Sequence, residues 1–272
     1  MSVKVFIDGS SGTTGLRIAD RLAQRPEIEL LSISAEGRKD VNERAKVINS
    51  ADLAFLCLPD AASKEVMPLL RPDVKVLDPS TAFRTDAAWD YGFPELKGQK
   101  EKIKNSDRVA VPGCYASGFI SIARPLVELG LAPADYPFSC TGISGYSGGG
   151  KKMIAEYESA DRPAHSKLDA PKSYGLGLAH KHLPEMQKIS GLAHTPMFVP
   201  VVCDYYCGMQ VLVPLDLTVA GTDRMELYMT VNAAGDQMML VSVFDNLGKG
   251  SSGAAVQCMN LMLGLEETEG LE

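Results

Sequence analysis

The sequence of 272 residues has no apolar run that approaches the roughly 20 residues of a membrane-spanning helix. It has no basic cluster either, and its net charge is −7, so neither nucleic acid nor an anionic membrane surface is expected as its main partner. The first residues lead directly into the strand pattern of residues 3–8, without the architecture of a signal peptide. These absences predict a cytoplasmic protein.

Cysteine and histidine are also few. Six cysteines at scattered spacings do not suggest a disulfide framework in a chain of this size. Cys203 and Cys207 are four residues apart, but no second Cys/His pair at finger spacing completes a zinc site, so we expect no metal. The composition, 45% hydrophobic and 22% charged, is that of an ordinary globular protein, and the length allows one large domain or two moderate ones.

What is present begins with a glycine-rich turn. Val3–Ile7 is a continuous apolar run, typical of a strand buried on both faces of a parallel sheet, and Leu16–Gln24 has helical spacing. Between them lies G-x-x-G-x-x-G, a variant of the dinucleotide fingerprint, although such stretches also form plain loops. The candidate cofactor-binding residues here are Gly9, Ser11, Gly12, Thr13, Thr14 and Gly15.

The second expected strand, Glu29–Ile33, should end near the ribose of a bound dinucleotide. Ser34, Arg38 and Lys39 follow it, and cations at this place favour the 2′-phosphate of NADP over NAD. The alternative is that the two basic side chains are solvated charges on a loop. Pro59, which ends the expected strand 53–58, is a further candidate cofactor contact.

Two polar residues follow the next strand, Val74–Leu77. Ligands of such sheets bind outside the carboxyl ends of the strands, so Ser80 and Arg84 are placed to meet an anionic substrate. Arg84 could equally be a surface or interface arginine.

The stretch Ala110–Gly118 predicts a strand that ends in a Pro-Gly turn, followed by a helix that extends to about Leu129. Cys114 then falls at the helix N-terminus, where unpaired N–H groups and the helix dipole favour negative charge. That environment stabilises a thiolate, which is the nucleophilic form of cysteine. The alternative is a buried cysteine that serves as a small hydrophobic residue.

The second half of the chain has a different pattern. Strands are expected at Tyr136–Thr141, Met209–Leu217, Glu226–Thr230 and Met238–Phe244, with the polar alternation of antiparallel pairing. The helix expected at Ser252–Leu263 should dock back on the nucleotide domain. The expected domains are therefore residues 1–113 with 249–272, and residues 114–248.

Two further stretches of the second half carry candidate functional residues. The glycine-rich loop Ser144–Gly150, followed by Lys151, can hold an oxyanion or phosphate, although it could also be a flexible hairpin. Ser144, Gly145, Ser147 and Lys151 are its candidate substrate contacts. His180 and His182 are candidates for the base that a thiol nucleophile needs. Both could reach one pocket from an extended chain, but only one from a helix.

The segment Pro112–Gly118, P-G-C-Y-A-S-G, resembles the active-site signature of the N-acetyl-gamma-glutamyl-phosphate reductases. Residues 7–15, 57–60, 144–151, 180–185 and 245–250 fit the shorter, type 2 branch of that family in the same order. The resemblance implies a Rossmann-type NADP-binding domain and an α+β catalytic domain of the glyceraldehyde-phosphate-dehydrogenase-like kind. It also implies that His182, with His180 as second candidate, is the active-site histidine and that Asn246 contacts NADP.

The same resemblance implies an oxidoreductase of arginine biosynthesis that reduces N-acetyl-gamma-glutamyl phosphate with NADPH. A Cys114 thioester forms, inorganic phosphate leaves and an aldehyde is released; the histidine takes the thiol proton and returns a proton to the product oxygen. Two alternatives are a dehydrogenase acting on another acyl phosphate, of the aspartyl phosphate type, and a nucleotide-binding regulatory protein that has lost catalysis. We also expect a homodimer or homotetramer, because the chain is shortened between Asp216 and Arg224 relative to the family.

Overall fold

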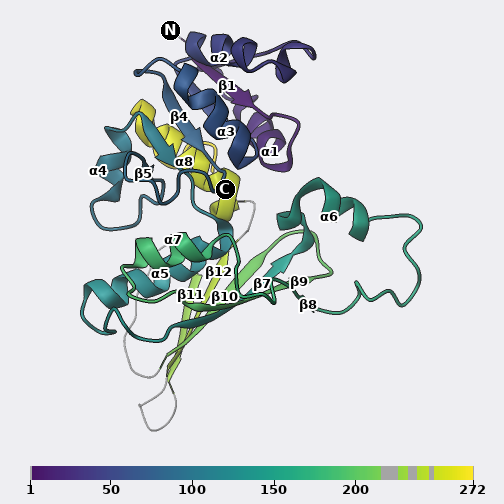
Figure 1. The fold of residues 1–272 in the computed structure, drawn as a ribbon, viewed down its shortest axis with the longest axis vertical. Coiled ribbons are helices and arrows are strands. Elements are labelled where there is room, and N and C mark those ends of the chain that lie inside the picture. Colours follow the sequence, from purple (N-terminus) through teal and green to yellow (C-terminus); the bar gives the residue numbers. More distant parts are fainter. Residues whose placement is uncertain (1, 216–225, 232–237, 245–247, 272) are drawn as a thin grey trace. The chain divides into compact units, whose positions relative to one another are not determined.

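The structure, a computed structural model, describes residues 2–215, 226–231, 238–244 and 248–271. The chain divides into two compact units (Figure 1). Unit 1 comprises Met1–Gly113 and Ser251–Glu272, and unit 2 comprises Cys114–Gly250. The sequence places the first boundary at the same peptide bond and the second two residues earlier.

Unit 1 contains a six-stranded parallel sheet with the strand order β2-β1-β3-β4-β6-β5. Its strands are β1 (Val3–Asp8), β2 (Ile28–Leu31), β3 (Leu53–Leu56), β4 (Lys75–Asp78), β5 (Asp90–Tyr91) and β6 (Arg108–Ala110). Its helices are α1 (Thr13–Leu22), η1 (Gly37–Lys39), α2 (Val41–Ser50), α3 (Asp60–Val66), η2 (Met67–Leu69), α4 (Gln99–Lys104) and α8 (Gly253–Leu263). This is a Rossmann-type arrangement, as the sequence predicts.

Alternate residues of the central strands enter two separate cores. Val5 and Ile7 pack with α1, α4 and α8 on one face of the sheet, whereas Phe6 packs with α2 and α3 on the other. Both faces of β1 are therefore buried, which explains why its sequence is continuously apolar rather than alternating. The C-terminal helix α8 completes the first core and is buried along most of its length.

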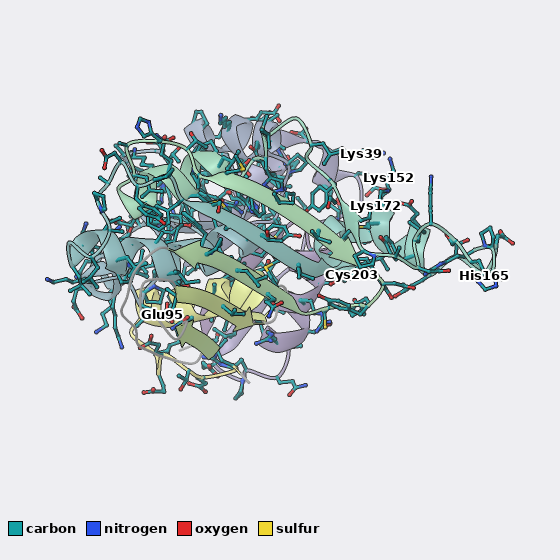
Figure 2. All side chains as sticks on the ribbon, turned by 90° about the horizontal axis from the view of Figure 1, so that it is seen from below. Lys39, Glu95, Lys152, His165, Lys172 and Cys203 are labelled. Atoms are coloured by element: carbon teal, nitrogen blue, oxygen red, sulfur yellow. The ribbon has the colours of Figure 1, made fainter. Side chains whose placement is uncertain are left out.

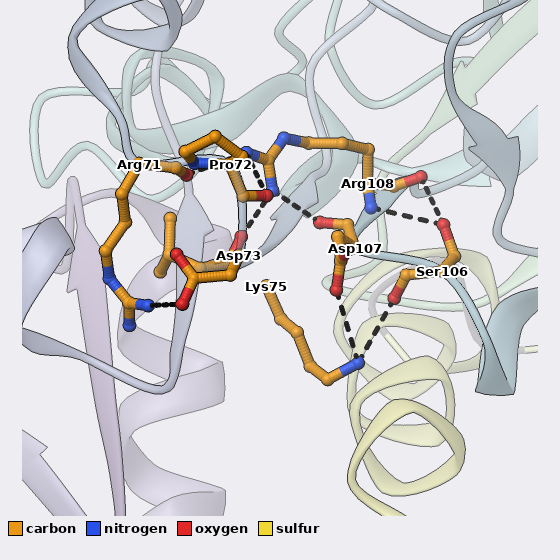
Figure 3. Close-up of polar contacts among 8 residues, drawn as sticks. Arg71, Pro72, Asp73, Lys75, Ser106, Asp107 and Arg108 are labelled. Carbon is orange, nitrogen blue, oxygen red and sulfur yellow. Dashed lines mark hydrogen bonds and ion pairs between the residues drawn. The ribbon is translucent and has the colours of Figure 1, made fainter.

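The amino ends of the unit 1 strands are held together by arginines (Figure 3). Arg108 donates to backbone carbonyl oxygens of residues 71, 72, 74 and 107. Arg71 donates to the carbonyl oxygens of Asn49 and Ala51 at 3.0 and 2.7 Å. Because backbone oxygens and, at Arg71, the Asp73 carboxylate already bind these guanidinium groups, this end of the sheet is structural and the carboxyl ends of the strands remain for ligands.

The glycine-rich turn after β1 depends on the absence of a side chain at Gly9. This residue has φ +84°, and a Cβ there would lie 2.9 Å from the carbonyl carbon of Cys57 and closer still to its oxygen. Gly15 is similarly close to the turn, since its Cβ would lie 2.9 Å from the Cα of Ser10. The turn can therefore lie against the end of β3 only with glycine at residue 9, and α1 can begin against the turn only with glycine at residue 15.

Unit 2 contains a mixed six-stranded sheet with the order β11-β12-β10-β7-β9-β8. Strands β7 and β9 are parallel, and the other pairs are antiparallel. Its strands are β7 (Ser139–Gly145), β8 (Lys172–Ser173), β9 (Met197–Cys203), β10 (Met209–Leu215), β11 (Glu226–Val231) and β12 (Met238–Phe244). Its helices are α5 (Cys114–Glu128), η3 (Tyr146–Gly149), α6 (Gly150–Tyr157), α7 (Leu183–Ser190) and η4 (Gly248–Ser252), which crosses into unit 1.

Helix α5 covers one face of this sheet, and the ring of Tyr115 in its first turn packs against Gly142 of β7. A Cβ at Gly142 would lie 2.5 Å from Cε1 of Tyr115 and closer still to its Cδ1. The opposite face is more open: Met197 and Val199 of β9 are 60% and 36% exposed, and Ile143 and Leu212 are half-buried. This half-exposed face is largely apolar.

Several elements differ from the sequence-based expectation. The strand predicted at Tyr136–Thr141 begins three residues later, because the N–H of Tyr136 closes a turn onto Pro133, and it continues to Gly145. Strand β9 and helix α7 are not predicted at all. A proline, Pro200, obscures the pattern of β9; it is tolerated because the short edge strand β8 pairs only with Val201 and Val202.

Two sequence-based expectations lie outside the described residues: the shortened stretch between Asp216 and Arg224, and Asn246. In the part of the chain that the structure describes, no helix is long and apolar enough to cross a membrane.

We expect Gly9→Ala to destabilise the protein by about 3 kcal/mol, since the substitution combines a left-handed backbone with overlap against Cys57. Gly98→Ala is the matched control, because Gly98 has φ +74° but no atom within 4 Å of the position of its Cβ. It should cost only about 1 kcal/mol. Urea unfolding measures both, and equal losses would contradict the close approach.

Gly142→Ala should cost about 1–3 kcal/mol, because the new methyl group overlaps the Tyr115 ring and forces it to move. Gly177→Ala, with no atom within 4 Å, is the control and should be close to neutral. The measurements are urea unfolding and near-ultraviolet circular dichroism of the aromatic residues. An unchanged aromatic spectrum in Gly142→Ala would refute the packing of this ring.

Candidate functional site

The N-terminus of α1 in unit 1 can accept an anion. The N-cap residue Gly12 has no side chain to bond the first N–H groups of the helix. These N–H groups follow the glycine-rich turn, which a Cβ at Gly9 or Gly15 would fill. The residues therefore fit the pyrophosphate of a dinucleotide, held by backbone N–H groups and the helix dipole. The hydroxyl of Thr14 lies 3.5 Å from that of Ser251, which also belongs to unit 1.

The turn after β2 carries the two candidate NADP-binding cations. Ser34 Oγ accepts the N–H of Gly37 at 3.0 Å, which fixes the short helix η1. Arg38 and Lys39 both lie in this helix and are exposed. Neither side chain forms an ion pair with any residue that the structure describes, so both can meet a ligand anion.

Two aspartates that the sequence reading did not single out lie buried where β1 and β4 end. Asp8 is 4% exposed and pairs with Arg44 at 3.6 Å; Asp78 is fully buried and accepts the N–H of Ser80 at 2.6 Å. Burial raises the pKa of both carboxyl groups, although Arg44 opposes this at Asp8 and the hydrogen bonds of Ser80 oppose it at Asp78. Burial also raises the pKa of the nearby Cys57 thiol, so Cys57 stays protonated.

The two other candidates in this region have structural contacts of their own. Pro59 is the N-cap of α3, and Ser80 Oγ accepts the N–H of Ala82 at 3.1 Å. Each therefore shapes the chain just beyond the carboxyl end of a strand, β3 or β4.

Arg84 is 8% exposed, which departs from the expectation of an arginine open to a substrate. Its Nε donates to the carbonyl oxygen of Val111 at 2.9 Å, and its Nη2 donates to that of Pro79 at 2.8 Å. It joins the residues that follow β4 to those that follow β6. Because Val111 precedes the Pro-Gly turn before Cys114, these bonds brace that turn.

Cys114 is the first residue of α5 and is half-buried. The next residue, Tyr115, is 3% exposed, and its hydroxyl accepts a hydrogen bond from the Tyr174 hydroxyl at 3.2 Å. Burial is the largest cause that raises the pKa of both phenols, to about 12 for Tyr174, and the charge of Cys114 acts in the same direction. The thiol therefore lies close to two neutral phenols.

The two candidate histidines of unit 2 meet at one place although they are not on an extended strand. The segment 180–183 is a turn, closed by the Leu183 N–H onto the His180 carbonyl oxygen at 3.0 Å. The two imidazole rings lie 4.7 Å apart, centroid to centroid, and the Tyr115 ring lies 5.9 Å from His180 and 6.0 Å from His182. The structure thus places both histidines beside the residue that follows Cys114.

The other two histidines do not join this group. His165 lies at the tip of the loop after α6, away from the strands of unit 2 (Figure 2), and His194 is exposed. Glu185, the last residue of the 180–185 segment, has no role assigned from the sequence; it is a buried acid, 1% exposed, in the first turn of α7. Its position three residues after His182 was the available signal. In the described part of the chain, no group of three or more acidic, cysteine or histidine side chains could hold a metal ion.

The backbone of the glycine-rich loop contradicts one expectation. The N–H groups of Gly145, Tyr146 and Ser147 donate to the carbonyl oxygens of residues 208, 205 and 206 at 2.9–3.0 Å. They are therefore not available to an anion, and the prediction of a backbone cradle at these three residues is wrong. Ser144 and Ser147 are also buried, whereas Lys151 is exposed in the first turn of α6.

Two family models match the chain, one in each unit. "Semialdehyde dehydrogenase, NAD binding domain" matches residues 4–106, and "Semialdehyde dehydrogenase, dimerisation domain" matches residues 114–219. Solved structures of aspartate semialdehyde dehydrogenases are similar in fold. A probable one from Pseudomonas aeruginosa has TM-score 0.71 at 16% identity and covers 97% of this chain and 99% of its own. One from Candida albicans, solved with NADP, has TM-score 0.68 at 14% identity over 96% and 98%.

Sequence relatives are much more similar. The N-acetyl-gamma-glutamyl-phosphate reductase of Trichormus variabilis is 43% identical over 98% of this chain and 99% of its own. That of Chelativorans sp. is 44% identical over 97% and 99%. The first alignment runs over 318 positions although this chain has 272 residues, so the relative contains segments that this chain lacks. The chain belongs to the N-acetyl-gamma-glutamyl-phosphate reductase family.

Proposed function

We propose that the protein reduces N-acetyl-gamma-glutamyl phosphate to N-acetylglutamate semialdehyde and phosphate, with NADPH as reductant, in arginine biosynthesis. The observation that carries the proposal is the position of Cys114 at the start of α5, next to the tyrosine whose ring contacts both histidines. A thiolate beside an imidazole is the arrangement that nucleophilic attack on an acyl carbon requires. The relatives named above carry the same activity in their names.

In this mechanism His182 takes the proton of the Cys114 thiol, and the thiolate attacks the acyl carbon. The bond between that carbon and the phosphate oxygen breaks, and the imidazolium returns its proton to the departing phosphate. The position of Cys114 at the N-terminus of α5 favours the negative sulfur. Bound NADPH supplies the hydride that converts the acyl group to the aldehyde.

NADPH would be held by the glycine-rich turn Gly9–Gly15, with Ser34, Arg38 and Lys39 toward its 2′-phosphate. Pro59 and Asn246 complete this set of cofactor residues. The substrate contacts expected from the sequence are Ser80, Arg84, Ser144, Gly145, Ser147 and Lys151, but the bonded N–H groups of Gly145 and Ser147 rule out a backbone contact at these two residues. Of these six, Lys151 is the exposed cation, so it is the best placed to attract a phosphate, while the buried contacts of Arg84 support a bracing role.

We also propose a cytoplasmic homodimer or homotetramer. The half-exposed apolar face of the unit 2 sheet supports this, because such a face is covered in a stable protein. The match of this unit to a dimerisation domain supports it as well. An enzyme acting on aspartyl phosphate is less well supported, since the aspartate semialdehyde dehydrogenases share only the fold at 13–18% identity.

The direct test runs the reaction backwards with N-acetylglutamate semialdehyde, NADP and phosphate, and follows NADPH at 340 nm. Phosphate-dependent formation of NADPH is expected. Turnover with aspartate semialdehyde instead would replace the proposed substrate, and bound NADP without turnover of either aldehyde would favour a regulatory protein.

Cys114→Ser should lower reductase turnover on the order of 10³-fold or more, because the hydroxyl is a far weaker nucleophile than the thiolate. NADPH binding should be unchanged, since Cys114 is not among the proposed nucleotide-binding residues, all of which except Asn246 lie in unit 1. Cys207→Ser, a half-buried cysteine elsewhere in unit 2, is the matched control. Substantial turnover in Cys114→Ser would disprove the thioester route.

Arg38→Ala combined with Lys39→Ala should raise KM for NADPH on the order of tenfold or more, because charge-assisted hydrogen bonds to the 2′-phosphate are lost. KM for NADH, which has no such phosphate, should change little. Lys102→Ala, an exposed lysine of α4, serves as the control for a general loss of positive charge. A parallel rise of KM for both cofactors would count against a 2′-phosphate site.

A further inference from the structure

The His180 imidazole is engaged by the backbone of its neighbour. The backbone N–H of His182 donates to His180 Nδ1 at 3.2 Å. His182 is also the N-cap of α7, so this bond fixes the point at which the helix begins. A neutral imidazole carries one proton, and a ring nitrogen that accepts a hydrogen bond has none. The proton of His180 must therefore be on Nε2.

The surroundings of His180 disfavour a second proton. If His180 were an imidazolium, its Nδ1 would also carry a proton, and this N–H would face the backbone N–H of His182 in place of the hydrogen bond. The rings of Tyr115, Tyr174, His182 and Phe198 enclose it at centroid distances of 4.7–5.9 Å. Of these groups the phenols are neutral and Phe198 is apolar, and the charge that acts on His180 is the cation Lys181. Burial, and then Lys181, lower the pKa of His180 to about 4.

We propose that the two histidines have different roles in the reaction. His180 is a neutral hydrogen-bond donor through Nε2–H, and His182 is the base. The inference rests on the proposed function and refines it. To act as base through Nε2, His180 would have to carry its proton on Nδ1, which would break the bond to the His182 N–H. A neutral donor instead suits the oxygen of the acyl group, which becomes negative when the thiolate attacks.

The step balances without a proton from His180. The sulfur electron pair forms the bond to carbon, and the carbonyl π pair moves to oxygen, where the Nε2–H donates. The pair then returns as phosphate departs with the proton that His182 removed from the thiol. His180 also holds the backbone of His182, so its side chain has a positioning contribution that must be separated from donation.

Two substitutions of His180 separate these contributions. Asn can place its Oδ1 near Nδ1 and accept the His182 N–H, but it has no donor at the position of Nε2. Gln can place an N–H near Nε2 but cannot accept at Nδ1. His182→Asn removes the proposed base. The measurements are kcat, KM and the pH profile of kcat/KM, together with the pH dependence of Cys114 alkylation by iodoacetamide, with Cys114→Ser as background.

His180→Asn should lower kcat on the order of 10²-fold with little change in KM, and should keep the acidic limb of the profile. His180→Gln should retain more of kcat than His180→Asn. His182→Asn should lose the acidic limb, and its Cys114 alkylation should shift to higher pH. Loss of the acidic limb in His180→Asn, or wild-type kcat in that variant, would overturn the division of roles.

Failure of the proposed function is recognised separately. If the wild-type protein forms no NADPH from the semialdehyde, NADP and phosphate, the proposed reaction is wrong, but alkylation still reports which histidine is coupled to the thiol. An alkylation profile that shifts in His182→Asn and not in His180→Asn supports the assignment of the base. A shift in His180→Asn alone refutes it.

Discussion

The contact between the Tyr115 ring and Gly142 is the constraint on which the reactive end of unit 2 depends. Tyr115 follows Cys114 directly, so the place of its ring fixes the first turn of α5 against β7. The same ring lies beside His180, His182 and Phe198, which come from the turn before α7 and from β9. Three segments distant in sequence therefore meet around one aromatic side chain, because strand β7 has no side chain at residue 142.

In unit 1, too, the absence of a glycine side chain permits a close approach, here in the turn proposed to bind the dinucleotide. Glycine permits the turn after β1 to approach the end of β3, and the first N–H groups of α1 remain for an anion. The amino ends of the strands are joined by Arg71 and Arg108, which donate to backbone oxygens and, from Arg71, to the Asp73 carboxylate. The two ends of the sheet therefore differ, and ligand binding is expected at the carboxyl ends of the strands. There Asp8 and Asp78 are buried, and Arg38 and Lys39 are exposed.

Residue type alone does not assign roles in this protein. Arg84 is a cation in a place suited to an anion, yet two of its nitrogens donate to the backbone before Cys114 and after β4. His180 and His182 have the same side chain, but His180 is half-buried and accepts a backbone hydrogen bond from His182, whereas His182 is 4% exposed. In each case the hydrogen-bond partners of the side chain, rather than its charge or residue type, determine which of its atoms can still bind a ligand or transfer a proton.

The sequence by itself determined the nucleotide turn, the expected position of Cys114 at a helix start, the Rossmann-type order of unit 1 and the family. These are local patterns, in which strand, turn and helix lie within about ten residues of one another. Only the tertiary structure decided which partners bind the backbone N–H groups of Gly145–Ser147 and the Arg84 guanidinium. It also decided which carboxyl groups are buried and which tautomer His180 adopts. The amides, for example, bond to residues 205–208, some sixty positions away. Such hydrogen bonds are created by packing, so a local pattern cannot reveal which donors remain free.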